Sequence, residues 1–216
     1  TLQTLGYSTD NGGYYYYNTL GKGMTYEETM IAVSDYAKAA GIPYKWWLAD
    51  SWWYYKGVGN GVKTWVARPD IFPRGLEYVW KRTGWPVQGH NRYWASDNTY
   101  AKQNGGAYDF LVDAESDFAL PNSQRFWDDL LRNSSLWGLR VYEQDWMYDE
   151  FDKFPPLTRS ATLARPCHHT TLRRLATRVC ARSQVSFCAN PELNTHRVAA
   201  RSKRRTSRAH HSGWLP

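Results

Sequence analysis

Val141-Tyr142-Glu143-Gln144-Asp145-Trp146 is the stretch on which the fold depends. It follows a run with helical spacing of apolar residues, Ser123 to Ser135, and a stop at Trp137-Gly138. The pattern therefore predicts a strand that the chain enters from a helix. This strand ends in two carboxylates and an aromatic side chain. Because α/β proteins place their functional side chains at the carboxyl ends of parallel strands, we expect the end of this strand to carry chemistry.

Strand and helix patterns alternate through the first 150 residues. A capping box, Thr25 with Glu28, begins the first predicted helix, and Gly41 ends it. The other predicted helices run from Phe72 to about Arg82 and from Ser123 to Ser135, and the predicted strands are 4–9, 44–50, 87–90 and 141–146. This order predicts an α/β fold with a parallel sheet, either doubly wound or part of a barrel. About four β/α units in roughly 150 residues make a partial (β/α)8 TIM-type barrel, since a whole one takes ~250.

Composition changes sharply near Leu157. Residues 158–216 hold 12 of the 27 basic residues and a single acid, Glu192, so this segment has a net charge of +11 and residues 1–157 about −4. All 16 Tyr and 11 of the 12 Trp precede the change, whereas all three Cys follow it. We therefore predict two parts: a barrel-like domain over 1–157 and a basic tail of low order over 158–216.

Three interpretations of the tail stay open. It is a disordered segment, an arm that binds nucleic acid through clusters such as Arg201-Ser202-Lys203-Arg204-Arg205, or a product of a shifted reading frame. Cys167-His168-His169, Cys180 and Cys188 have the residue types of metal ligands, but their spacing fits no closed zinc pattern. We expect no metal and no cofactor. No stretch approaches ~20 apolar residues, so we expect no membrane span either.

Polar residues stand at the ends of all four predicted strands. If the sheet is parallel, these ends converge on one face. Aromatic residues accompany them, and sugars bind to such mixtures, because rings stack on their C–H faces while carboxylates hold their hydroxyls. The sequence therefore favours a carbohydrate partner; the alternative is that the tryptophans are core residues. The candidate residues are Asp10, Asp50, Trp52, Trp53, His90, Arg92, Glu143, Asp145 and Trp146. Other acids, including Glu27, Glu28, Asp128 and Asp129, are interpreted as solvated helix faces.

Three motifs in the same order resemble α-galactosidase-like glycoside hydrolases, a group that includes raffinose-synthase-like enzymes. Phe72-Pro73-Arg74-Gly75-Leu76 is similar to the FP-x-GL motif between the second and third strands of that barrel. Leu48-Ala49-Asp50-Ser51-Trp52-Trp53 resembles the second strand and Tyr142-Glu143-Gln144-Asp145 the fourth, with Leu5-Gly6-Tyr7-Ser8-Thr9 a looser match to the first. The resemblance covers about residues 4–149, the N-terminal half of the barrel.

The resemblance implies a retaining hydrolase of α-linked sugars, with Asp145 as nucleophile and Asp50 as a ligand of sugar hydroxyls. Such enzymes need a second carboxyl group as proton donor, which the family takes from a later strand. The tail offers only Glu192, and Glu143 stands where relatives carry Lys. We therefore expect this chain to be inactive as a hydrolase, or to be a non-catalytic carbohydrate-binding or structural protein. Like-charge repulsion between Glu143 and Asp145 is expected to raise the pKa of one of them. The family resemblance also suggests a secreted or vesicular setting.

Overall fold

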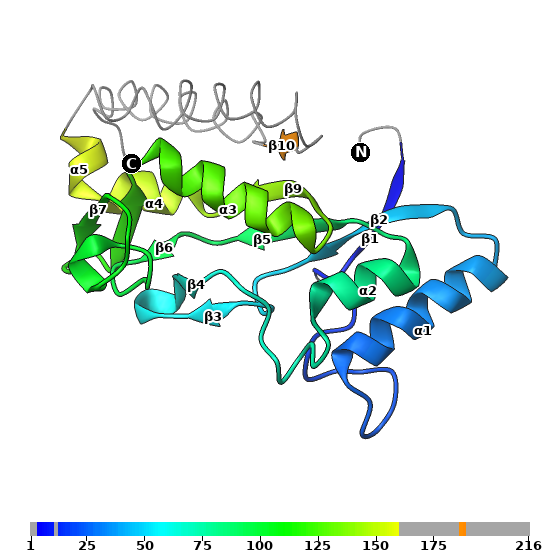
Figure 1. Ribbon diagram of the computed structural model, residues 1–216. Helices are drawn as coiled ribbons and strands as arrows, with labels where there is room; N and C mark the ends of the chain where they lie inside the picture. The colour runs from blue at the N-terminus through cyan, green and yellow to red at the C-terminus, as the bar shows by residue number, and fades with distance from the viewer. Residues whose placement is uncertain (1–3, 11–12, 160–185, 189–216) are drawn as a thin grey trace, which may run out of the picture.

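The computed structural model describes residues 4–10, 13–159 and 186–188 (Figure 1). The chain forms an α/β fold around a five-stranded sheet in the order β1-β2-β5-β9-β10, and every neighbouring pair in it is parallel. The strands are β1 (Leu5–Ser8), β2 (Tyr44–Ala49), β5 (Val87–Asn91), β9 (Leu139–Gln144) and β10 (Ser186–Cys188). The α/β class and the parallel sheet agree with the prediction from the alternating patterns.

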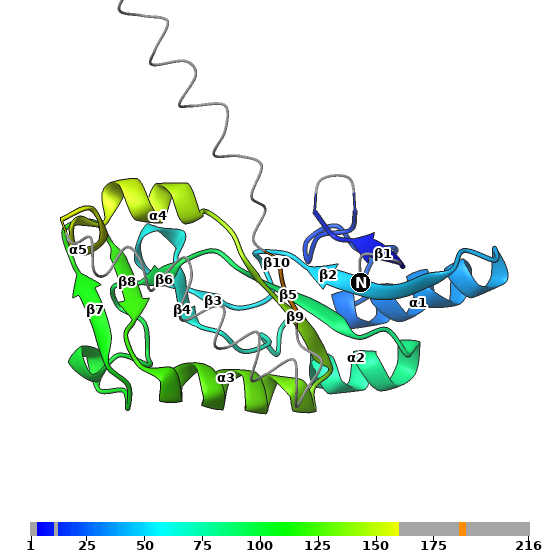
Figure 2. The same ribbon diagram turned by 90° about the horizontal axis from the view of Figure 1, so that it is seen from above.

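Three helices connect the first four parallel strands. They are α1 (Tyr26–Ala39), α2 (Gly75–Thr83) and α3 (Gln124–Leu136), and Figure 2 shows them along one side of the sheet. The predicted capping box is present, because the Glu28 amide donates to the Thr25 hydroxyl and the Glu28 carboxylate accepts from the Thr25 amide. Gly84 follows α2 in the left-handed conformation, with φ of 76°, which explains why a glycine stops the helix there.

The FP-x-GL stretch, residues 72–76, begins α2 and contacts α1 through Arg74 and Glu27. Phe72 and Leu76 are buried, and Gly75 has φ of 81°, a conformation that only glycine adopts without strain. Between them, the Arg74 amide donates to Glu27 Oε2 over 2.9 Å, and the Arg74 guanidinium pairs with Glu27 Oε1. Glu27 is completely buried, so its interpretation as a solvated residue was wrong. The carboxylate is buried because the motif supplies both a backbone and a side-chain donor.

A second sheet is built from the connections that follow β2 and β5. Its order is β3-β4-β6-β8-β7, and it is mostly antiparallel. The strands are β3 (Tyr55–Lys56), β4 (Val62–Thr64), β6 (Trp94–Ala95), β7 (Phe110–Asp113) and β8 (Phe118–Pro121), with two short 3-10 helices, η1 (Val58–Asn60) and η2 (Lys102–Asn104). The sequence predicted only loops here. Because both connections leave the carboxyl ends of their strands, the second sheet lies on the side of the candidate site.

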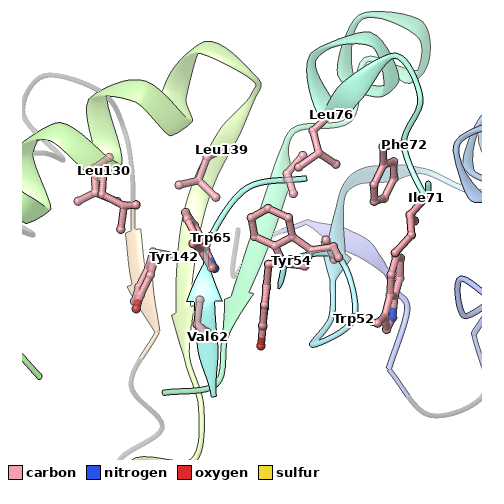
Figure 3. Packing of buried hydrophobic residues seen from close by; sticks show 14 of the residues in the cluster. Trp52, Tyr54, Val62, Trp65, Ile71, Phe72, Leu76, Leu130, Leu139 and Tyr142 are labelled. Atoms are coloured by element: carbon pink, nitrogen blue, oxygen red, sulfur yellow. The ribbon is translucent and has the colours of Figure 1, made fainter. Parts of the chain in front are cut away.

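Aromatic side chains from both sheets, their connections and the helices fill the core. Trp47, Trp53, Trp65 and Trp94 are almost completely buried. Figure 3 shows Trp65 beside Tyr142, with ring centroids 5.3 Å apart, and Trp52 near Phe72, where the rings stack at 6.1 Å. Such contacts add to the large apolar area that each ring buries. Much of the aromatic content noted in the sequence is therefore structural.

Two further helices follow β9, and β10 covers its edge. They are α4 (Met147–Lys153) and α5 (Pro155–Thr158), which pack near β7 and β8 (Figure 2). Phe187 of β10 stands in register with Tyr142 of β9. The remaining residues after Arg159, including the Cys167 and Arg201 clusters, lie outside the described residues, and the boundary at Leu157 stays a prediction. None of the helices in the described part is long and apolar enough to span a bilayer.

Candidate functional site

The carboxyl ends of the parallel strands bring four predicted site residues to one edge of the sheet. Asp50 follows β2 directly, Arg92 follows β5, Asp145 follows β9, and Asp10 lies two residues after β1. The strands are held in register at this end, since the Asp145 amide donates to the Asn91 carbonyl over 2.8 Å. The Thr9 hydroxyl likewise joins β1 to β2 by donating to the Leu48 carbonyl. The convergence predicted for a parallel sheet is therefore present in the fold.

His90 connects the carboxylates of two strands. Its Nε2 lies 3.2 Å from Asp145 Oδ2 and 3.6 Å from Asp50 Oδ1. The imidazole is almost completely buried, whereas 53% of the Asp145 side chain is exposed. On the other side of the ring, the Tyr54 hydroxyl lies 3.1 Å from Nδ1. An imidazole whose Nε2–H donates to the carboxylates has Nδ1 free to accept from Tyr54, so each ring nitrogen has a partner.

The backbone under His90 is also fixed. Its carbonyl accepts from two indole N–H groups, Trp65 Nε1 at 2.9 Å and Trp53 Nε1 at 3.3 Å. Both indoles are buried, so they hold this carbonyl from the core side. The position of the imidazole therefore follows from the packing of the aromatic core. Trp53 contributes to the site from beneath, as a support of the strand that carries His90.

The two carboxyl groups beside His90 have pKa values shifted in opposite directions. The hydrogen bond from His90 is the main reason why the pKa of Asp145 is lowered, and the Trp146 amide and Arg92 act in the same direction. Burial raises the pKa of Asp50, and neighbouring Asp10 adds to this effect, while His90 opposes it. The lowered pKa of Asp145 favours its ionised carboxylate, whereas the raised pKa of Asp50 favours its protonated form.

Trp146 continues from Asp145 in a strained backbone conformation. Its φ is 57°, in the left-handed region that non-glycine residues rarely occupy. The conformation lets the Trp146 amide donate to Asp145 Oδ1 over 2.7 Å and turns the indole toward Arg92, whose guanidinium lies 4.0 Å from the ring centre. The strained backbone of Trp146 thus occurs together with a hydrogen bond that fixes the Asp145 carboxylate and with stacking of Arg92 on the indole.

Glu143 lies beside Gln88, which donates from Nε2 to Glu143 Oε2 over 2.8 Å. Glu143 is also in register with His90, so both side chains belong to the same face of the sheet. The expected repulsion between Glu143 and Asp145 does not dominate at Asp145, because His90 lowers the pKa of that carboxyl rather than raising it. Asp145 is therefore not the group whose pKa such repulsion raises.

The structure places Trp52 and Trp53 in the core, with 4% and 0% of their surface exposed. Trp52 contacts Tyr26 and Phe72, which come from other elements. Their burial favours the alternative that these tryptophans are core residues. Of the aromatic candidates, Trp146 is the one that combines partial exposure with a position next to Asp145.

Sequence reasoning missed two neighbours of the site, and it placed Tyr54 only among the aromatic residues around the strand ends. Gln88 precedes His90 by two residues, so the alternation of a strand could have placed both on one face. Lys56 lies in β3 of the second sheet, whose short strands left no periodic signal. Among the described residues, no cluster of three His, Cys, Asp or Glu side chains could hold a metal ion.

Glycoside hydrolases of known structure are similar to this chain. An α-galactosidase from Thermus thermophilus in complex with stachyose has 16% identity and a TM-score of 0.48, over 84% of this chain and 39% of that one. A trehalulose synthase variant in complex with Tris has 12% identity and a TM-score of 0.47, over 85% and 44%. A xylosidase from Aspergillus niger has 14% identity and a TM-score of 0.39, over 56% and 19%.

An α-galactosidase, the class that the sequence motifs resemble, is thus among the structures similar to this chain. The chain spans less than half the length of each of these three proteins. No protein-family model and no curated protein matches the sequence.

Proposed function

We propose that the chain is the N-terminal part of a (β/α)8 barrel that binds an α-linked sugar, with Asp145 as the nucleophile. The contact between Asp145 and His90 carries the proposal, because it couples an accessible carboxylate to a buried imidazole that keeps it ionised. Four parallel strands in chain order, each joined to the next through a helix, support the partial barrel. Asp50 is suited to bind sugar hydroxyls beside it.

The chemistry follows from the position of Asp145. Its carboxylate oxygen attacks the anomeric carbon and forms a glycosyl ester, while the bond from that carbon to the leaving oxygen breaks. The leaving oxygen then needs a proton from a second carboxyl group ~5–5.5 Å away. The described strand after β9 is Ser186-Phe187-Cys188, which carries no carboxyl group. We therefore expect the glycosyl ester to form only from substrates whose leaving group needs no proton. Ordinary glycosides should be hydrolysed very little.

A substrate with an activated leaving group tests this proposal. α-Galactosyl fluoride releases fluoride without a proton donor, so the chain should gain one hexosyl unit, seen by intact-mass spectrometry. The ester should persist, because the missing carboxyl group would also act as base in the second step. Peptide mapping should place the label on Asp145.

Two variants complete the experiment. Asp145→Asn should prevent labelling, whereas Asp149→Asn, four residues later and paired with Lys153, should not. Labelling that survives Asp145→Asn would contradict the nucleophile assignment. Rapid hydrolysis of an unactivated aryl α-galactoside, lost in Asp145→Asn, would contradict the missing proton donor.

A non-catalytic carbohydrate-binding protein is the second candidate. The absence of a carboxyl group from β10 favours it. Trp146 stands next to Asp145, so sugar binding should change its fluorescence. A saturable change with galactose, together with no labelling by the fluoride, would select this candidate.

A further inference from the structure

We propose that Arg92 and Lys56 form a subsite for an anionic group on the sugar, either a carboxylate or a sulfate ester, beside Asp145. The inference rests on the proposed function, because it concerns the substrate class of the same site. It also goes beyond that function, since neither an α-linked sugar nor Asp145 chemistry requires a charged substituent.

Arg92 is held in place at the strand ends. Its carbonyl accepts from Gln144 Nε2 over 2.9 Å, which fixes the backbone against β9. Its guanidinium lies 4.0 Å from the ring centre of Trp146 and 5.7 Å from that of Tyr93. Stacking uses the flat face of a guanidinium, so the N–H groups around its edge remain for an acceptor in the same plane.

The edge of this guanidinium lacks a protein acceptor. Arg92 Nε is buried and has no hydrogen-bond partner within the described residues, and the same residues contain no ion pair of Arg92. A buried charged N–H without an acceptor costs free energy. The nearby carboxylate of Asp145 is already engaged by His90 and the Trp146 amide. The terminal N–H groups of the same guanidinium also have no acceptor among the described residues, so a carboxylate or sulfate that reaches them would give the Arg92 charge a partner of matching geometry.

Lys56 approaches from the second sheet. It lies in β3, which pairs with β4, and Val62 of β4 is in register with Trp94, two residues after Arg92. Partial burial lowers the pKa of Lys56, and the positive charge of Arg92 lowers it further. Lys56 likewise has no ion pair within the part of the chain that the structure describes. Two cations therefore come together where a bound anion would relieve their repulsion.

Most other basic residues of the described part behave differently. Lys63, Arg74 and Lys102 each pair with a carboxylate at short distance, as do several helix residues. Arg92, in contrast, lies beside Asp145 without an ion pair among the described residues, and Lys56 is close enough to Arg92 and Asp50 to be affected by their charges. A neutral sugar would leave both without an acceptor. A sugar with an acidic substituent would use Arg92 and Lys56 for that substituent and the carboxylates for its hydroxyls.

Sugar binding measured without turnover tests this inference. The Asp145→Asn chain would be titrated with galactose, galacturonic acid and galactose 6-sulfate by calorimetry, at low and high salt. We expect at least one acidic sugar to bind about tenfold more tightly than galactose, which is the effect of one charge-assisted contact. High salt should reduce this preference. The two acidic sugars distinguish a carboxylate from a sulfate ester.

Variants identify the groups responsible. Arg92→Gln and Lys56→Gln should each abolish most of the preference for the acidic sugar over galactose, whereas Lys45→Gln, a change of an exposed lysine of β2, should leave that preference intact. Arg92→Lys should retain part of the preference for the acidic sugar, because lysine keeps the positive charge but lacks the forked donor geometry of a guanidinium. Equal binding of all three sugars would overturn the subsite but not the proposed function, as would a preference that survives both Gln variants. Binding of no sugar would overturn both.

Discussion

At the scale of single residues, His90 is the main cause of the lowered pKa of Asp145. A carboxylate at the end of a strand is an ordinary feature, but one that accepts a hydrogen bond from a buried imidazole is not. Tyr54 on Nδ1 and the two carboxylates on Nε2 fix which nitrogen carries the proton. His90 therefore positions the Asp145 carboxylate and stabilises its negative charge. This effect on Asp145 can be measured without turnover.

Replacing His90 by Gln should raise the pKa of Asp145 toward its ordinary value. The hydrogen bond from His90 is the main cause of the lowered pKa, and a neutral amide replaces it only in part. Carbon-detected NMR of selectively labelled aspartate would follow the titration of this carboxyl group. Tyr54→Phe, which leaves the imidazole in place, is the milder companion variant. An unchanged Asp145 titration in His90→Gln would show that His90 does not control it.

The sequence predicted the places of the candidate residues in the fold better than their surroundings. Asp50, His90 and Asp145 could be found because each ends a strand with a clear pattern. The burial of Trp52 could not, because it depends on Tyr26 and Phe72, which lie far away in the chain. Whether an indole faces a ligand or a core is decided by tertiary contacts, and a strand end carries no local signal of that difference.

At the scale of secondary-structure elements, α4 contains a buried acid that the proposed chemistry does not use. Glu150 is almost completely buried, and its Oε1 has no hydrogen-bond partner among the described residues. Burial raises the pKa of Glu150 to about 8. The unfolded chain ionises this group near its ordinary value of about 4.3. Between these two values the native state keeps a proton that the unfolded state has lost.

This difference predicts that stability falls as pH rises through that window. The native state binds more protons there, so the free energy of unfolding should drop by at most about 1.4 kcal/mol per pH unit and level off above about pH 8. Glu150→Gln stays neutral, so it should remove this slope and stabilise the protein most near pH 8. Urea unfolding of both chains between pH 5 and 9 measures the effect. Parallel stability curves for the two chains would rule it out.

The ion pair between Glu27 of α1 and Arg74, which precedes α2, predicts that substitutions of these two residues affect stability non-additively. Arg74→Gln should lower the free energy of unfolding, because buried Glu27 then keeps only the backbone donor of residue 74. The loss should be modest, because half of the Arg74 side chain is exposed. Adding Glu27→Gln should cost less than the sum of the single changes. Urea unfolding of the four chains of this cycle checks the coupling, and strictly additive losses would refute it.

Elements with local signals were predictable, and elements without them were not. Thr25, Gly84 and Gly138 mark helix ends through hydrogen bonds or backbone angles that depend on adjacent residues. The strands of the second sheet are two to four residues long, too short to show alternation. They exist because neighbours from distant connections pair with them, as Val62 does with Trp94.

At the scale of the whole molecule, the parallel sheet extends one strand beyond β9, because β10 pairs with the edge of β9. The partner could not be predicted, because Ser186–Cys188 lies in a segment without strand periodicity. Covering an edge removes a template for pairing with other chains.

Replacing Phe187 by Pro should therefore increase self-association. Proline removes a backbone N–H and is poorly tolerated within a paired strand, so β10 should leave the edge of β9. Sedimentation velocity at several protein concentrations would show larger species for Phe187→Pro than for Ser186→Ala. Identical sedimentation of the two variants would show that β10 does not protect this edge.

The second sheet also has a consequence for how such a protein changes over generations. Its strands occupy two long connections at one end of the parallel sheet, whereas α1, α2 and α3 lie along the side (Figure 2). Insertions or deletions in these connections reshape the surroundings of Asp145 without disturbing the helices. A single-residue insertion within Val87–Asn91, by contrast, would turn His90 to the opposite face of its strand. New specificities should therefore arise by altered loop lengths at this end, while strand lengths stay constant.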